Sequence, residues 1–138
     1  MFDANRDPGA DANGDGARSE PVLDNASLDQ LRALDPHGGS FLKRVLQTYQ
    51  RSLTQQQQGI DQAFGAGEWQ ALSHAAHALK SASASVGALQ LSSLCARMEQ
   101  GVREARLDDM GSLVEQFRAE AVRVHAAVAE LLDGGGLP

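Results

Sequence analysis

Two histidines and a lysine follow one another at three-residue spacing in a part of the chain where most side chains are small. His74, His77 and Lys80 are these residues, in the stretch A-L-S-H-A-A-H-A-L-K-S-A-S-A-S-V-G-A over 71–88. A neutral imidazole has a nucleophilic ring nitrogen at physiological pH, and a lysine one helical turn away can share an anion bound there. The residue types therefore suit three alternatives: a metal site, a phosphoryl-accepting histidine, or two surface histidines without a task.

A helical arrangement of this stretch places both histidines away from the core. With about 100° of rotation per residue, one face of the helix collects a buried stripe, which comprises Leu72, Ala75, Ala76, Leu79, Ser83 and Val86. His77 lies about 140° from Leu72 on this wheel, and His74 lies about 200° from it. The outer face around His77 carries small residues, namely Ser73, Ser81, Ala84 and Ala88. Such short side chains leave room for the surface of another protein to reach the ring.

A metal site is the weakest of the three alternatives. Histidines at i and i+3 supply two ligands, whereas a stable zinc site needs three or four. The predicted helix has no Cys, Asp or Glu after Glu68 that would complete the set. A surface histidine without a task is common on a helix, but the small neighbours and Lys80 favour the phosphoryl-accepting interpretation of His77.

The rest of the chain predicts helices that hold this stretch in place. Hydrophobic residues make up 42% of the 138 residues and aromatic residues only 4%, a composition that favours helices over strands. Apolar residues at helical spacing predict helices near 24–34, 41–64, 68–85, 88–105 and 109–132. Because the connections are short, we expect an all-α fold, an antiparallel up-down-up-down four-helix bundle with the short first helix across one end.

The two ends of the chain differ in composition from the helical part. Residues 1–21 are rich in Asp, Asn and Gly and nearly free of large apolar side chains, which predicts a disordered leader or linker. The helical bundle is predicted over 22–133. The glycine-rich residues 134–138 predict a frayed tail.

The charge and the cysteine content exclude some classes of protein. The formal net charge of -6 argues against a nucleic-acid binder, because affinity for a phosphate backbone comes largely from Lys and Arg. The single cysteine, Cys95, cannot form an internal disulfide and suits a reducing compartment, so we expect a cytoplasmic protein. No apolar run approaches the roughly 20 residues that span a bilayer, so we expect no membrane contact by this chain. We also expect a monomer.

The stretch around His77 resembles the histidine-containing phosphotransfer (HPt) domain of two-component phosphorelays. The pattern of that family is close to A-H-x-L-K-G-S-x-x-x-x-G-A, followed by L-x-x-x-C-x-x-L-E. Residues 76–88 match its first part, and its second part is matched by Leu91, Cys95, Met98 and Glu99. The resemblance covers about 22–132, with a specific central motif and compatible flanks.

The resemblance implies a role for each matching residue. His77 would accept a phosphoryl group from the aspartyl phosphate of a receiver domain and pass it to the aspartate of another. Lys80 would be the counter-charge, and Glu99 matches a position, often Gln or Glu, whose side chain can orient the ring. Ser81 departs from the glycine that the family often has there, which leaves the exact approach of a partner open.

The resemblance also implies partners and a docking surface. The partners would be response-regulator receiver domains and an upstream hybrid sensor kinase, and the receiver would supply Mg²⁺, with no cofactor in this chain. The chain would be a carrier rather than an enzyme, either free-standing or at the cytoplasmic end of a membrane-bound kinase. The predicted docking residues are Ser73, His74, Ser81, Ala84, Gly87 and Ala88, together with Leu28, Leu31 and Phe41, for which the bundle core is the alternative.

Two other functions remain open at this point. One alternative is a helical adaptor that docks a receiver domain without carrying phosphate. The other is a small four-helix carrier of a metal or another ligand.

Overall fold

The structure, a computed structural model, describes residues 21–35 and 40–135. In this part of the chain it contains five α-helices and a short π-helical turn, and no strand. The elements are α2 (Asn25–Ala33), α3 (Ser40–Ala66), α4 (Trp69–Ser85), α5 (Leu89–Arg103), α6 (Met110–Glu130) and η1 (Leu131–Gly135). The predicted all-α fold is confirmed. The leader predicted over 1–21 lies outside the described residues up to residue 20, as do residues 136–138 of the predicted tail.

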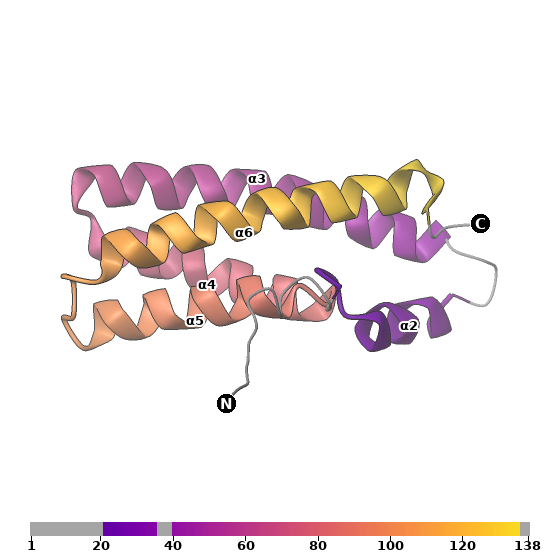
Figure 1. Ribbon diagram of the computed structural model, residues 1–138, viewed down its shortest axis with the longest axis horizontal. Helices are drawn as coiled ribbons and strands as arrows, with labels where there is room; N and C mark the ends of the chain where they lie inside the picture. The colour runs from indigo at the N-terminus through magenta and orange to yellow at the C-terminus, as the bar shows by residue number, and fades with distance from the viewer. Residues whose placement is uncertain (1–20, 36–39, 136–138) are drawn as a thin grey trace, which may run out of the picture.

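The four long helices form an antiparallel bundle with α2 at one end (Figure 1). Each helix packs against the next along the chain, and α6 returns to lie against α3. This is the predicted up-down-up-down arrangement, which follows from the short connections between the helices. None of the described helices is long and apolar enough to cross a membrane.

The buried face of α4 coincides with the stripe expected from its helical wheel. Leu72, Ala76, Leu79 and Ser83 are fully buried. Each buried leucine contributes roughly 1.5–3 kcal/mol, so this stripe holds α4 firmly in the bundle and keeps its opposite face outward. The one polar member of the stripe is paired, because the hydroxyl groups of Ser83 and Tyr49 lie 2.7 Å apart in the core between α4 and α3.

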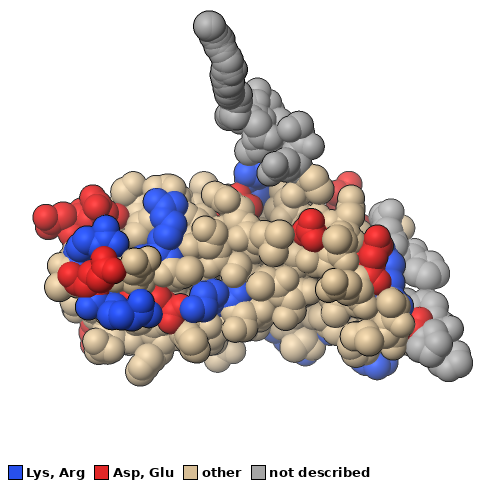
Figure 2. Space-filling view, turned by 90° about the horizontal axis from the view of Figure 1, so that it is seen from below, with Lys and Arg blue, Asp and Glu red and all other residues tan. Residues whose placement is uncertain are grey.

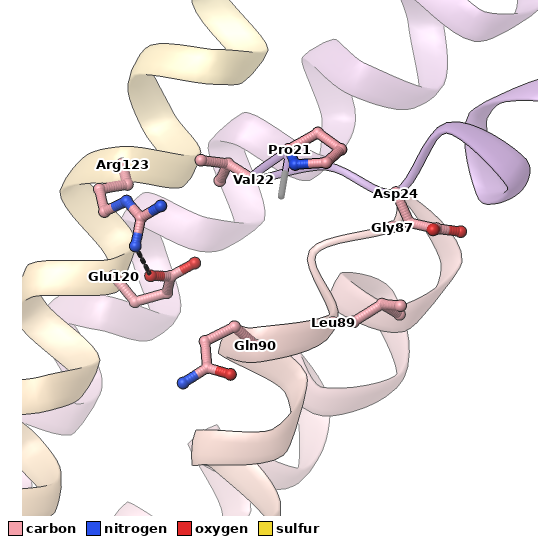
Figure 3. Close-up of a pocket in the computed structure, with 8 residues that line it drawn as sticks. All are labelled: Pro21, Val22, Asp24, Gly87, Leu89, Gln90, Glu120 and Arg123. Atoms are coloured by element: carbon pink, nitrogen blue, oxygen red, sulfur yellow. Dashed lines mark hydrogen bonds and ion pairs between the residues drawn. The ribbon is translucent and has the colours of Figure 1, made fainter. Parts of the chain in front are cut away.

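The turn between α4 and α5 is tied to the start of α2. The backbone N–H of Asp24 donates a hydrogen bond of 2.8 Å to the carbonyl oxygen of Gly87. The Asp24 carboxylate in turn caps α2 by accepting the backbone N–H of Ser27 at 2.9 Å. Figure 3 shows how closely Asp24 and Gly87 approach, beside a pocket whose α6 wall holds the ion pair of Glu120 and Arg123.

Candidate functional site

His77 projects from the outer face of α4, and its ring is fixed from one side. The side chain is 66% exposed, and its Nδ1 lies 2.8 Å from Oε2 of Glu99 on α5. A carboxylate only accepts hydrogen bonds, so Nδ1 carries the ring proton and donates it to Glu99. The other nitrogen, Nε2, keeps its lone pair and has no hydrogen-bond partner among the described residues. The exposed ring thus presents its nucleophilic nitrogen.

Lys80 holds the second oxygen of the same carboxylate. Its Nζ lies 2.7 Å from Oε1 of Glu99, and its side chain remains 34% exposed. Oε1 is buried and has no other polar partner, so the ammonium of Lys80 compensates its burial. Ser92 on α5 donates a hydrogen bond of 2.9 Å to the backbone carbonyl of Lys80, which ties the two helices together at this level.

Glu99 is ionised at neutral pH in spite of its burial. Burial opposes the charged form, but the hydrogen bonds from Lys80 and then His77 outweigh it and hold the pKa of Glu99 below its ordinary value. The side chain is only 9% exposed, so the negative charge interacts with its two partners with little screening by water. The structure brings together His77, Lys80 and Glu99, the three residues for which the resemblance implies a chemical role.

The predicted docking residues divide into an exposed group and a buried group. His74, Ser81 and Ala84 are exposed beside His77, and Ser73 is partly exposed. Leu31 and Phe41 are partly buried, so they retain some accessible surface.

Three docking predictions are corrected by the structure, because Leu28, Gly87 and Ala88 are buried. Leu28 is 3% exposed and belongs to the core beneath α2. Gly87 is covered by the backbone of Asp24, and Ala88 is fully buried. The helical wheel of α4 was continued past the end of the helix at Ser85, so it treated the turn as helix. A wheel also carries no information on a distant segment, here the backbone at Asp24, that covers the turn.

An apolar groove between α3 and α4 extends the exposed small-residue surface. It is lined mostly by apolar atoms of Phe41, Arg44, Val45, Thr48, Tyr49, Ser52, Ala82, Ser85 and Val86. Only Phe41 of this set was predicted for docking. Val45 and Tyr49 belong to the apolar face of α3 in the sequence, and one helix alone does not show how much of that face α4 leaves uncovered. The signal in the sequence that could have indicated the groove is the small size of Ala82 and Ser85, which leave space between the two helices.

Arg44 brings positive charge to this groove, although the chain as a whole is acidic. Residues 40–54 of α3 contain Lys43, Arg44 and Arg51 and no acidic residue, and α4 contains Lys80 and no acidic residue. On the face shown in Figure 2, acidic and basic side chains gather most densely at one end of the bundle and are sparse over the middle. A partner with an acidic binding surface therefore fits the α3–α4 side.

A metal site finds no support in the geometry of the described residues. They contain no group of three or more His, Cys, Asp and Glu side chains arranged to hold a metal ion. His74 stands exposed on the same helix as His77 and makes no hydrogen bond or ion pair in the described structure. The two histidines thus differ: His77 has a carboxylate partner and a neighbouring cation, and His74 has neither.

Comparison with known proteins gives a family match and a similar solved structure. The family model described as "Hpt domain" matches residues 44–133, more than half of the chain. The crystal structure of histidine-containing phosphotransfer protein B (HptB) from Pseudomonas aeruginosa PAO1 is similar, with a TM-score of 0.75 and 26% sequence identity. The match covers 82% of this chain and 96% of that one. No curated protein matches the chain significantly.

Proposed function

Because the chain belongs to the Hpt domain family, we propose that His77 carries a phosphoryl group between receiver domains of a two-component phosphorelay. The observation that carries this proposal is the exposed ring, whose Nδ1 is held 2.8 Å from a buried carboxylate while Nε2 stays open. The predicted phosphoacceptor is thus fixed in the tautomer that its chemistry requires.

The transfer step requires little from this chain beyond position and charge. The lone pair of His77 Nε2 attacks the phosphorus of an aspartyl phosphate, the N–P bond forms, and the P–O bond to the aspartate breaks. The aspartate leaves as a carboxylate, and the ring keeps its Nδ1 proton against Glu99. Lys80 offers positive charge to the incoming phosphoryl oxygens. The reverse sequence passes the group to the next receiver, which makes the chain a carrier and not a kinase.

The receiver domain docks over the α3–α4 side in this proposal. Its acidic pocket would face the basic residues of α3, and a hydrophobic part of its surface would fill the groove beside Phe41 and Val45. Exposed Ser81 and Ala84 are short enough to let the pocket reach Nε2 in line. The receiver would bring the aspartate and Mg²⁺, and a hybrid sensor kinase would supply the phosphoryl group. We propose that the chain acts in the cytoplasm and as a monomer.

Phosphoryl transfer from a charged receiver tests this function. Receiver domains from the same organism are phosphorylated with acetyl phosphate and mixed with the chain, and the label on the chain is followed. We expect label that is acid-labile and base-stable, absent from His77→Gln and retained by the matched control His74→Gln. A folded wild-type chain that binds the receiver but takes no label would instead support an adaptor without phosphate chemistry. Label that persists in His77→Gln would exclude His77 as the acceptor.

A further inference from the structure

The geometry points to a second task for Glu99: we infer that it is a positioning residue that holds Lys80 as well as the His77 ring. One carboxylate would then set the places of the nucleophile and of the cation before the phosphoryl group arrives. This inference rests on the proposed function, because it concerns how the same site binds a phosphoryl group. It goes further by making the action of Lys80 depend on Glu99.

The two partners use different oxygens of the carboxylate. His77 Nδ1 lies 2.8 Å from Oε2, and Lys80 Nζ lies 2.7 Å from Oε1. Glu99 itself is 9% exposed and comes from α5, whereas both partners come from α4. The buried carboxylate is therefore held in place by the core, and it binds two side chains that are more exposed than its own.

Lys80 can remain attached to Glu99 while it binds a phosphoryl group. An ammonium has three N–H donors, and in the described structure Nζ is in ion-pair contact with a single acceptor, Oε1 of Glu99. The side chain is 34% exposed, which leaves room for the ammonium to bind a phosphoryl oxygen as well. Without Glu99, the flexible four-carbon stem of Lys80 would sample many rotamers and would lose entropy each time it bound the anion.

A carboxylate is the side chain that satisfies both partners at once. Glutamine in its place has one acceptor and one donor end, while His77 Nδ1–H and the Lys80 ammonium both require acceptors. If the glutamine oxygen accepts from the ring, its amide N–H groups face Lys80 and push the ammonium away. If the amide donates to Nδ1, the ring proton moves to Nε2 and the nucleophilic lone pair is lost. Both arrangements slow phosphorylation.

Chemical phosphorylation by potassium phosphoramidate tests the inference without a docking step. Nε2 attacks phosphorus, the N–P bond to the ring forms, and the amino group of phosphoramidate leaves as ammonia. The rate at His77 is measured by intact mass and site-specific mass spectrometry at neutral pH. Wild type is compared with Glu99→Gln, Lys80→Met and the double variant, and the exposed His74 in each chain is the internal reference.

We expect Lys80→Met to react about tenfold more slowly than wild type, the size of one lost charge-assisted interaction. Glu99→Gln and the double variant should share one rate that is lower still, because both also lose the carboxylate contact of the His77 ring. The rate at His74 should not change. If Glu99→Gln slows the reaction of Lys80→Met by the same factor as that of wild type, the two residues act independently and the inference fails. A faster reaction of Glu99→Gln would show that the carboxylate repels the anion, which also overturns it.

Stability gives a readout that does not depend on phosphorylation. Lys80→Met leaves Oε1 of Glu99 buried without a partner, so this variant should unfold at a lower temperature than wild type. Adding Glu99→Gln removes the unpaired charge and should raise the midpoint again. If the double variant is less stable than Lys80→Met, Glu99 and Lys80 are not coupled in this way.

Glu120→Gln is the matched control for removing a buried glutamate. Glu120 is also nearly buried and paired with a cation, Arg123 at 3.1 Å, but it lies on α6. Its substitution should leave the rate at His77 unchanged. The labelling experiment also separates the two proposals. A wild-type chain that phosphoramidate does not label at His77 contradicts the proposed function. Normal labelling of wild type, together with independent effects of Glu99→Gln and Lys80→Met on the rate, contradicts only the inference.

Discussion

The identity of the proton-bearing ring nitrogen decides what His77 can do. An unpartnered imidazole exchanges its proton between two tautomers, and only one of them leaves Nε2 free to attack. The contact with Glu99 selects that tautomer at the cost of burying a carboxylate, and Lys80 offsets this cost at the opposite oxygen. Three common residue types would thus form the proposed phosphoryl-accepting site because of how they are paired.

Stability as a function of pH should report the ion pair at Glu99 directly. The pKa of Glu99 is lowered in the folded protein, so its contribution is present above the ordinary value of 4.5 and lost as the pH falls through the lowered value. We compare the stabilities of His77→Gln and His77→Gln/Glu99→Gln by urea unfolding. Because both chains carry His77→Gln, no histidine titrates at this site in the comparison. The advantage of the glutamate over glutamine should be constant from pH 7 to 5 and should shrink towards pH 3.

Glu120 provides a control with the opposite sign. Burial raises its pKa, and the charge of Arg123 offsets this only in part. The contribution of Glu120 is therefore present below 4.5 and lost as the pH rises through its raised folded value. Between pH 7 and 5, lowering the pH should raise the stability of wild type relative to Glu120→Gln. Over the same range the stability difference between His77→Gln and His77→Gln/Glu99→Gln should stay constant. If acidification changes both stability differences in the same direction, an effect of low pH on the whole protein, and not these two side chains, controls the stability.

The sequence indicated the reactive residue types but not their contacts. Spacing along one helix placed His77 outward with Lys80 one turn away, because a helix has a known rotation per residue. The match of Glu99 came from a family resemblance, and its contact with the ring depends on how α5 rotates against α4. That rotation is set by core packing between helices, which residue spacing within each helix does not specify.

At the scale of the elements, the helix boundaries were predicted within a few residues, but the contacts made by the turns were not. Apolar stripes of α3 to α6 alternate with polar faces, so their period is visible in the sequence. The stretch after Ser85 has no such signal for what covers it. Gly87 was predicted as a docking residue, but the backbone of Asp24 occupies the space beside it.

Substitution of Gly87 should destabilise the fold strongly. Its φ of +87° is unfavourable for other residues, and an added Cβ would lie 2.7 Å from the backbone nitrogen of Asp24. We expect Gly87→Ala to lower the free energy of unfolding by more than about 2 kcal/mol in urea titrations. The matched control is Gly65→Ala in α3, where nothing lies within 4 Å of the added Cβ. It should gain about 0.5–1 kcal/mol. Equal stabilities would contradict the proposed close packing of α2 on the turn.

For the whole molecule, the uneven distribution of charge matters more than its sum. A net charge of -6 disfavours an acidic partner at long range, yet residues 40–54 of α3 and the whole of α4 carry basic residues and no acidic one, and Arg44 lines the groove between these helices. Within about one Debye length, roughly 8 Å at physiological salt, the local charges dominate. The acidic total disfavours nucleic acids, and in the proposed function the basic residues of α3 would help to orient a receiver domain towards His77.

Charge reversal at the groove should therefore slow docking without changing the chemistry at His77. Arg44 lines the groove, and Arg44→Glu should reduce the rate of transfer from a charged receiver by about tenfold at low salt. The loss should shrink in 0.5 M salt (about 4 Å screening) and should not affect labelling by phosphoramidate. The control Arg97→Glu changes the same charge at an exposed site that faces α6, and should behave like wild type. If both variants slow transfer equally, net charge guides the receiver; if only Arg44→Glu does, the receiver approaches over the groove.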